Sequence, residues 1–193
     1  MELETIKRKL IKRLSKEKYI HSISVMDTAV DMARHYGVFD ERFVIAGLLH
    51  DCAKDISTEE MFKLCVKYHV KVDIYQKSQP ALLHGALGAE IAKHDFEIED
   101  EEILRSIKYH TTGCENMGMF EKIIYMADYI EPGRCFLGVK KLRKLSYKNI
   151  DQAMVEGLNM SIKEVIKKKG LIHPDTIHAR NSILVNCNLQ KGK

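Results

Sequence analysis

Hydrophobic residues recur along the chain at intervals of three and four residues, the spacing that places them on one face of an α-helix. The pattern begins with Leu3, Ile6, Leu10 and Leu14, which polar and basic residues separate. Similar patterns predict helices at about residues 3–14, 16–36, 40–50, 57–68, 80–93, 100–110, 119–130, 149–168 and 174–188. Because no segment sustains the polar–apolar alternation of a β-strand, we expect an all-α fold that forms one domain over residues 1–193.

Capping and turn-forming residues mark several of the predicted boundaries. Ser57, with Glu60 three residues later, is typical of a capping box at the start of a helix. Pro80 suits the first turn of the next predicted helix. The residues between these two helices, 70–79, are polar and mixed and predict a loop. The segment 131–134, Glu-Pro-Gly-Arg, predicts a turn.

The composition is typical of a soluble protein. The chain has 193 residues, of which 45% are hydrophobic and 30% are charged, and its formal net charge is +4. No apolar run approaches the roughly 20 residues that span a bilayer, and the N-terminus has no signal-peptide pattern. We therefore expect a cytoplasmic protein with no membrane partner. The basic runs 7–9 and 140–144 have few aromatic neighbours and indicate solvated helix faces, so an anionic small molecule is favoured over nucleic acid.

The five cysteines are an odd number without CxxC pairs, which argues against a disulfide framework and against a zinc knuckle. Cys52 follows a His-Asp pair and could be a catalytic thiol. No neighbouring sequence feature supports that role, and a small buried side chain that fills space is favoured.

The strongest chemical signal is the segment 47–51, Gly-Leu-Leu-His-Asp, where an apolar run ends in an imidazole beside a carboxylate. A His–Asp pair that is hydrogen-bonded inside the core would explain the dipeptide alone. However, His21 and Asp128 also lie in apolar helical segments, where a buried charge needs a partner or a metal ion. Together with His50 and Asp51 they predict a site for a first-row divalent metal. Iron, manganese, cobalt and zinc all accept such ligands, and open positions on the ion could bind water and phosphate.

Three more histidines, His84, His110 and His173, border apolar helical stripes and could face the same pocket. A structural, hydrogen-bonded role is the alternative for each, and it explains His173 equally well. The other histidines have charged neighbours and are predicted to be exposed: His35, His69, His94 and His178.

Two basic residues near these motifs are candidates for phosphate contacts. Lys54 lies one helical turn after Asp51, where a fixed cation could neutralise a phosphate beside the metal. Arg134, in the predicted turn, could hold a phosphate with two hydrogen bonds. A solvated surface side chain is the alternative for both residues.

The order His21, His50-Asp51, Asp128 resembles the HD superfamily of metal-dependent phosphohydrolases. The strings 84–89 (His-Gly-Ala-Leu-Gly-Ala), 108–113 (Lys-Tyr-His-Thr-Thr-Gly) and 127–134 (Ala-Asp-Tyr-Ile-Glu-Pro-Gly-Arg) are similar to the YqeK family within it. That family comprises HD-domain enzymes that hydrolyse diadenosine tetraphosphate symmetrically to two ADP. The likeness runs from about residue 16 to 185 and implies an HD-type helical bundle with an iron-containing site.

The resemblance also implies roles for individual residues. The implied metal ligands are His21, His50, Asp51 and Asp128. Contacts to the nucleotide phosphates or to a further metal are implied for His84, His110, Thr111 and Arg134, and Lys18 stands where relatives carry a basic residue. From these positions we expect catalysis to depend on Asp51, Lys54, His84 and His110, and we add His173 to the substrate-binding residues.

Two other readings of the sequence stay open. One is a different HD-domain nucleotide phosphohydrolase, such as a nucleotidase or a cyclic-nucleotide phosphodiesterase; a guanosine alarmone hydrolase is disfavoured because Lys54-Asp55 stands where those enzymes place a Glu-Asp pair. The other is a non-catalytic nucleotide-sensing module, which would be expected to lose a ligand, whereas this chain keeps all four. The number of metal ions and the oligomeric state also stay open, a homodimer included.

Overall fold

The computed structural model describes the backbone of residues 2–191 and the side chains of residues 2–187. All regular structure in this part of the chain is helical, which confirms the all-α prediction. The helices are α1 (Leu3–Arg13), α2 (Lys16–His35), α3 (Arg42–Leu49), α4 (Thr58–Lys67), α5 (Ile74–Ser78), the 3-10 turn η1 (Pro80–Leu82), α6 (Leu83–Asp95), α7 (Glu101–Tyr109), α8 (Met119–Ile130), α9 (Val139–Lys148), α10 (Ile150–Lys167) and α11 (Pro174–Lys191). None of the described helices combines the length and the apolar character that a bilayer crossing demands.

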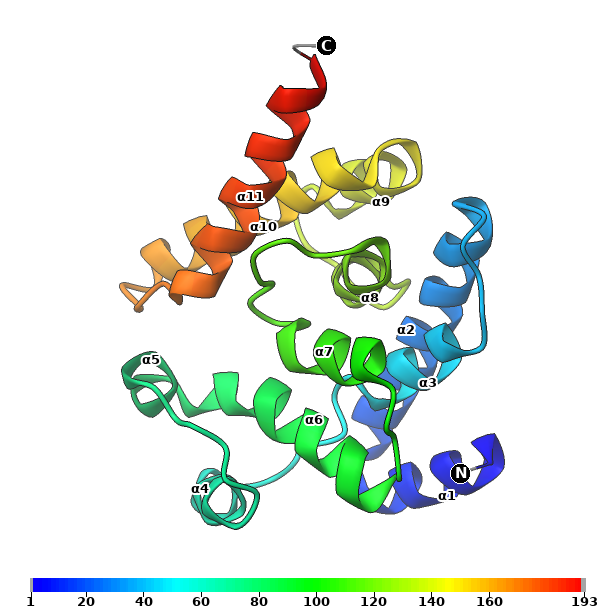
Figure 1. The fold of residues 1–193 in the computed structure, drawn as a ribbon, viewed down its shortest axis with the longest axis vertical. Helices are drawn as coiled ribbons and strands as arrows, with labels where there is room; N and C mark the ends of the chain where they lie inside the picture. The colour runs from blue at the N-terminus through cyan, green and yellow to red at the C-terminus, as the bar shows by residue number, and fades with distance from the viewer. Residues whose placement is uncertain (1, 192–193) are drawn as a thin grey trace.

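Helix α8 lies at the centre of the bundle (Figure 1). Helices α2, α3 and α7 pack against it, as do α9 and α10. Most of its side chains are buried, including the unbroken run 123–127. Because most of α8 is buried, Asp128 near its end is held within the bundle, with 19% of its side chain exposed.

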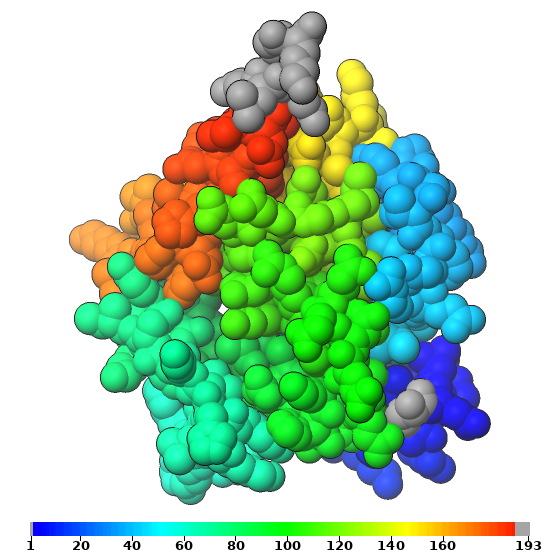
Figure 2. Space-filling model, in the orientation of Figure 1, coloured from blue at the N-terminus to red at the C-terminus, as the bar shows by residue number. Residues whose placement is uncertain are grey.

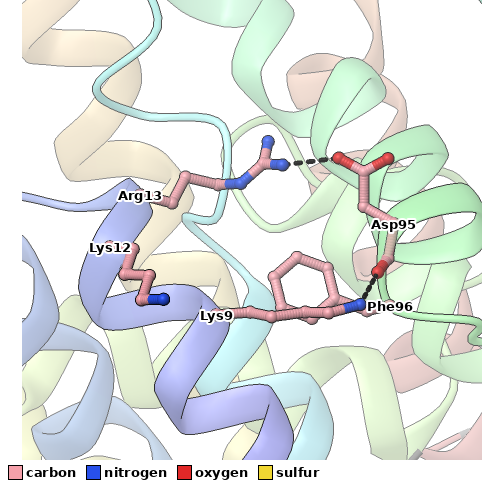
Figure 3. Close-up of a pocket in the computed structure, with 5 residues that line it drawn as sticks. All are labelled: Lys9, Lys12, Arg13, Asp95 and Phe96. Carbon is pink, nitrogen blue, oxygen red and sulfur yellow. Dashed lines mark hydrogen bonds and ion pairs between the residues drawn. The ribbon is translucent and has the colours of Figure 1, made fainter.

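Helix α1 is tied to the end of α6 by its basic residues (Figure 3). Lys9 Nζ donates to the Asp95 carbonyl oxygen at 2.6 Å, and the Arg13 guanidinium donates to the Asp95 carboxylate. Together with Lys12 and Phe96 these residues line a cavity of about 580 Å³. None of the predicted histidines or metal ligands lines this cavity, so it is not the candidate functional site despite its volume.

The structure differs from the predicted elements in three places. Residues 74–78 form a helix instead of a loop, because Asp73 and Gln76 make a complete capping box at its start. Pro80 opens a 3-10 turn, and the α-helix begins only at Leu83. Helix α9 was not among the predicted elements. The basic run 140–144 within it forms an exposed face, as its charge predicted, except that Leu142 is buried and Arg143 is half-buried.

Of the five cysteines, only Cys52 was given a role from the sequence, that of a small buried side chain. All five are free. Cys52 is fully buried, and its Sγ lies 3.4 Å from the Gly88 carbonyl oxygen. Burial raises the pKa of the Cys52 thiol to about 12, so the group stays protonated at neutral pH and fills space.

Candidate active site

The four predicted metal ligands converge from three helices of the bundle. His21 lies on α2, His50 caps the end of α3 with Asp51 in the turn after it, and Asp128 lies on α8. The His21 Nε2 is 3.0 Å from the Asp128 Oδ1, and the His50 Nε2 is 3.7 Å from the Asp51 Oδ2. Because α3 ends at Leu49, the neighbouring side chains of His50 and Asp51 can both face this point.

The other oxygen of Asp51 faces a second group of side chains. Its Oδ1 lies 3.2 Å from the His84 Nε2 and 3.2 Å from the His110 Nε2. The Lys54 Nζ is 3.4 Å from the same oxygen and 3.0 Å from the His84 Nε2. Asp51 therefore stands between two sets of histidines and offers one carboxylate oxygen to each.

Three of these histidines are oriented in the same way. The Nδ1 of His50 lies 2.8 Å from the Gly47 carbonyl oxygen, and the Nδ1 of His110 lies 2.7 Å from that of Ile107. His84 makes the equivalent contact with the carbonyl oxygen three residues before it. A carbonyl can only accept, so each Nδ1 carries the proton and each Nε2 presents its lone pair to the cluster.

These side chains fit a divalent metal ion. The His50 Nε2 is buried and has no hydrogen-bond partner among the described residues. Burial lowers the pKa of His50 to about 4, so its ring is neutral and free to act as a ligand. Burial opposes ionisation of Asp128, but its hydrogen bond with His21 and the charges of its neighbours hold its pKa well below the usual range. Neutral imidazole nitrogens and ionised carboxylates are the protonation states that bind metals.

The donor atoms are also close enough to share ions. Three groups have ligand atoms that all lie within 4.8 Å of one another: His21, His50 and Asp51; His50, His110 and Asp128; and Asp51, His84 and His110. Mixed nitrogen and oxygen ligation of this kind accommodates iron, manganese, cobalt and zinc without selecting one of them.

The remaining predicted residues border this cluster. Thr111 Oγ1 is 3.1 Å from the Nε2 atoms of both His84 and His110. The Arg134 Nε donates to the Asp128 carbonyl oxygen at 2.8 Å, and its guanidinium also pairs with the Asp128 carboxylate. Lys18 lies one helical turn before His21, which places it on the same side of α2.

Two glycines allow the helices that carry the histidines to approach closely. A Cβ on Gly47 would lie 2.6 Å from the Met26 Cα, and a Cβ on Gly85 would lie 2.6 Å from the Lys108 carbonyl oxygen. A larger residue would therefore push α3 away from α2, or α6 away from α7. The second approach brings the histidines of α6 and α7 together, with 3.0 Å between their Nε2 atoms.

Comparison with known proteins agrees with this geometry. A family model described as the HD domain matches residues 19–133. A symmetrical bis(5'-nucleosyl)-tetraphosphatase of Halalkalibacterium halodurans is 38% identical over 172 residues, which cover 89% of this chain and 91% of that protein. The corresponding Bacillus subtilis protein is 35% identical over 169 residues, which cover 88% of this chain and 90% of its own. This chain belongs to the YqeK family of HD-domain proteins.

A solved structure supports the fold of this YqeK family member. The crystal structure of a protein from Clostridium acetobutylicum, described as a predicted HD superfamily hydrolase involved in NAD metabolism, superimposes with a TM-score of 0.93. The two chains are 41% identical, and the match covers 96% of this chain and 98% of the other. The resemblance drawn from the sequence motifs is confirmed.

Glu131 is part of the site and was missed by reasoning from the sequence. Its side chain is buried, and the His21 Nδ1 donates to its Oε1 at 3.2 Å. Its Oε2 accepts from the Gly133 backbone N–H at 2.5 Å, and a Cβ on Gly133 would come within 3.0 Å of both carboxylate oxygens. A carboxylate behind a metal-binding histidine fixes the ring orientation. Its position three residues after Asp128, directly after an apolar segment, was the signal available in the sequence.

Arg143 is a second residue whose role only the structure reveals. It lies in the basic run that was predicted to be a solvated face. Its guanidinium donates to the carbonyl oxygens of Ile130, Glu131 and Arg134 at 2.7, 2.7 and 2.8 Å. Arg143 thus holds the turn from which Glu131 and Arg134 reach the cluster.

His173 lies apart from the other candidate histidines. Its Nε2 is 2.9 Å from the Asp73 Oδ2, and its ring packs edge-on against Tyr75. Both His173 and Thr111 line a cleft of about 420 Å³ beside the cluster. The four histidines that were predicted to be exposed, His35, His69, His94 and His178, are exposed.

Proposed function

We propose that this protein hydrolyses diadenosine tetraphosphate symmetrically to two molecules of ADP, in a single catalytic domain over residues 1–193. The curated relatives that cover most of the chain are symmetrical bis(5'-nucleosyl)-tetraphosphatases, which supports this substrate. The observation that carries the proposal is the shared carboxylate of Asp51, which has His50 on one side and His84 and His110 on the other. A cluster of this kind can hold metal and phosphate in a buried position next to an open cleft.

The metal ligands in this proposal are His21, His50, Asp51 and Asp128, and His84 and His110 with Asp51 could hold a second ion. We propose iron, with manganese, cobalt or zinc as alternatives that the donor atoms equally allow. When bound, such an ion supplies Lewis-acid activation of water and charge neutralisation at the phosphate.

The residues around the cluster bind and orient the polyphosphate. Arg134 contacts Asp128 and Lys54 contacts Asp51, so the two cations border different parts of the cluster, where each can neutralise a phosphate. Thr111 can donate a hydrogen bond to a phosphate oxygen, and Lys18 can add positive charge beside His21. ADP is a weakly basic leaving group, so little protonation is required. His84 or His110 could supply that proton only when its Nε2 is protonated and binds no second ion.

The location, partners and assembly of the enzyme are further proposals that follow from its nucleotide substrate. We expect it to act in the cytoplasm on a freely diffusing nucleotide, without nucleic acid. A homodimer is among the assemblies we expect.

The direct test is hydrolysis of diadenosine tetraphosphate in ¹⁸O-labelled water, followed by separation and mass analysis of the products. We expect ADP alone, with one labelled oxygen for each bond cleaved, and loss of turnover after removal of metal by a chelator. AMP together with ATP would mean asymmetric cleavage and would contradict the assignment. Turnover of mononucleotides without cleavage of the dinucleotide would favour a nucleotidase.

Metal analysis of protein isolated without chelator tests the proposed metal centre. We expect about one or two first-row metal ions per chain, with iron predominant. A metal-free protein with full turnover would end the metal-centre proposal, whatever its substrate.

A further inference from the structure

The turn that follows α8, residues 131–134, carries two groups of the candidate site. Glu131 supports His21 from behind, and Arg134 contacts Asp128. The last carbonyl groups of a helix have no N–H in the same helix from which to accept a hydrogen bond, so other donors must reach them. The donors that fix this turn therefore also decide where the two site groups point.

The side chain of Arg143 supplies such donors. Its Nε donates to the Ile130 carbonyl oxygen at 2.7 Å, and one terminal nitrogen donates to the carbonyl oxygens of Glu131 and Arg134 at 2.7 and 2.8 Å. Its positive charge lies at the C-terminal end of α8, where the helix dipole favours a cation. A lysine could not serve all these carbonyls together, because its ammonium is a single point whereas the guanidinium is a planar fork.

Helix α9, which carries Arg143, is also fixed to α2, the helix that carries His21. The Tyr147 hydroxyl donates to the Asp31 carboxylate at 2.5 Å, and the His35 Nε2 lies 2.6 Å from the Tyr147 carbonyl oxygen. Figure 2 shows the yellow surface that includes α9 beside the light-blue surface around the end of α2. Helix α9 thus bridges the helix of a predicted metal ligand and the turn after α8.

From these contacts we propose that Arg143 is a positioning residue of the site, which sets the metal affinity through Glu131 and the substrate affinity through Arg134. Its hydrogen bonds to the turn all end on backbone oxygens, so it acts on the site only through the turn. The metal half of the inference needs only the proposed metal centre, and the substrate half rests on the proposed function. Misplacement of a site group by about 1 Å can cost about 10²-fold in rate, even when its cause is distant.

Both halves follow from where the acceptors of Arg143 lie. They stand on both sides of the Pro-Gly corner, so the guanidinium holds the two arms of the turn together. One arm places the Glu131 carboxylate 3.2 Å from the His21 Nδ1, and the other places the Arg134 Nε 2.8 Å from the Asp128 carbonyl oxygen. Loss of the guanidinium would free both arms at once.

The test compares Arg143→Met with Lys144→Met. Methionine keeps an unbranched apolar stem and removes the donors, and Lys144 is the next residue on α9, exposed and of equal charge. We expect Arg143→Met to raise the Kd for Mn²⁺, measured by equilibrium dialysis, by about tenfold. The KM for diadenosine tetraphosphate at saturating Mn²⁺ should also rise about tenfold. Lys144→Met should leave both constants unchanged.

Two double-mutant cycles separate positioning from fold stability. In a Glu131→Ala background, Arg143→Met should change the Kd for Mn²⁺ by no more than about twofold, because the carboxylate through which it acts is already absent. In an Arg134→Ala background, the same limit should hold for the KM. The full tenfold effect in both backgrounds would overturn the inference. A lower melting temperature with unchanged Kd and KM would also overturn it, because Arg143 would then serve the fold alone.

A second variant serves if Arg143→Met does not fold. Arg143→Lys keeps the charge at the end of α8 but not the fork, so both constants should still rise, and unchanged constants would refute the positioning role. Absence of dinucleotide cleavage in the unaltered protein would remove the proposed function together with the substrate half of this inference. The cycle of Mn²⁺ affinities with Glu131→Ala would still decide the metal half.

Discussion

The two ring nitrogens of His21 have different carboxylate partners: Nδ1 donates to Glu131 at 3.2 Å, and Nε2 lies 3.0 Å from Asp128. Glu131 therefore orients the ring from behind, while Asp128 shares the proposed metal position. The Glu131 carboxylate also accepts a hydrogen bond from the Gly133 backbone N–H, and it therefore links His21 to the turn that carries Arg134.

Glu131→Ala should weaken metal binding about 10- to 100-fold, because the ring of His21 loses the partner that fixes its orientation. Glu131→Gln keeps an acceptor oxygen and should retain a larger share of the affinity. Equilibrium dialysis against the metal measures both. The exposed Glu115 provides a matched control, since Glu115→Ala removes a carboxylate without contact to the cluster. Unchanged metal affinity in Glu131→Ala would show that the contact is structural only.

Asp51→Ala and Lys54→Ala should separate metal binding from phosphate neutralisation. The first removes the carboxylate shared by both sets of histidines, so metal content and turnover should both be lost, turnover by about 10²-fold or more. The second should keep the metal and lose mainly rate. Metal content and kcat measured on the same preparations decide the point. Normal metal content and turnover in Asp51→Ala would refute the assignment of this residue.

Arg134→Ala should raise the KM by about tenfold and lower kcat less, if the guanidinium contacts the phosphate equally in the ground and transition states. Arg134→Lys retains the charge but not the two-pronged hydrogen bonding, and should recover only part of the loss. Lys140→Ala on the exposed face of α9 controls for the change in net charge. A fall in kcat at constant KM would place Arg134 in transition-state stabilisation instead.

Gly85→Ala and Gly157→Ala form a matched pair of helical substitutions. A Cβ at Gly85 would meet the Lys108 carbonyl oxygen at 2.6 Å, whereas at Gly157 the nearest atom is the Met126 Sδ at 3.7 Å. The first should destabilise the fold by about 1–3 kcal/mol and separate the histidines of α6 and α7. The second should be neutral or stabilising, because alanine lowers the entropy of the unfolded chain. Thermal unfolding and metal content test both, and equal melting temperatures would argue against the close helix approach.

Cys52 should be unreactive despite its place beside Asp51. Its pKa is raised to about 12 by burial, so the reactive thiolate is scarce at pH 8 and increases only as the pH approaches that value. At pH 8 a thiol reagent should therefore modify the exposed Cys135 well before Cys52. Cys52→Ala should keep turnover while losing some stability from the lost packing. Loss of turnover in a folded, metal-loaded Cys52→Ala would revive the catalytic-thiol alternative.

The positions of the longer helices could be predicted because each must bury an apolar face, and that requirement is written in the spacing of its residues. The central helix was predicted at residues 119–130 and observed at Met119–Ile130. Prediction was wrong for α5, where five residues are too few to show a period and a capping box decides the structure. It also omitted α9, which has few buried residues and is anchored by Arg143 through backbone carbonyls of another segment.

The sequence by itself also determined which histidines and aspartates could bind a metal, because ionisable groups inside apolar segments need a partner or an ion. Only the tertiary structure decided that Asp51 offers one oxygen to each set of histidines, that Glu131 supports His21 and that His173 lies in a neighbouring cleft. These contacts join distant parts of the chain: His21 and Glu131 are 110 positions apart. Local hydrophobic spacing sets which face of a helix is buried, but the residues opposite that face are selected by how the helices pack.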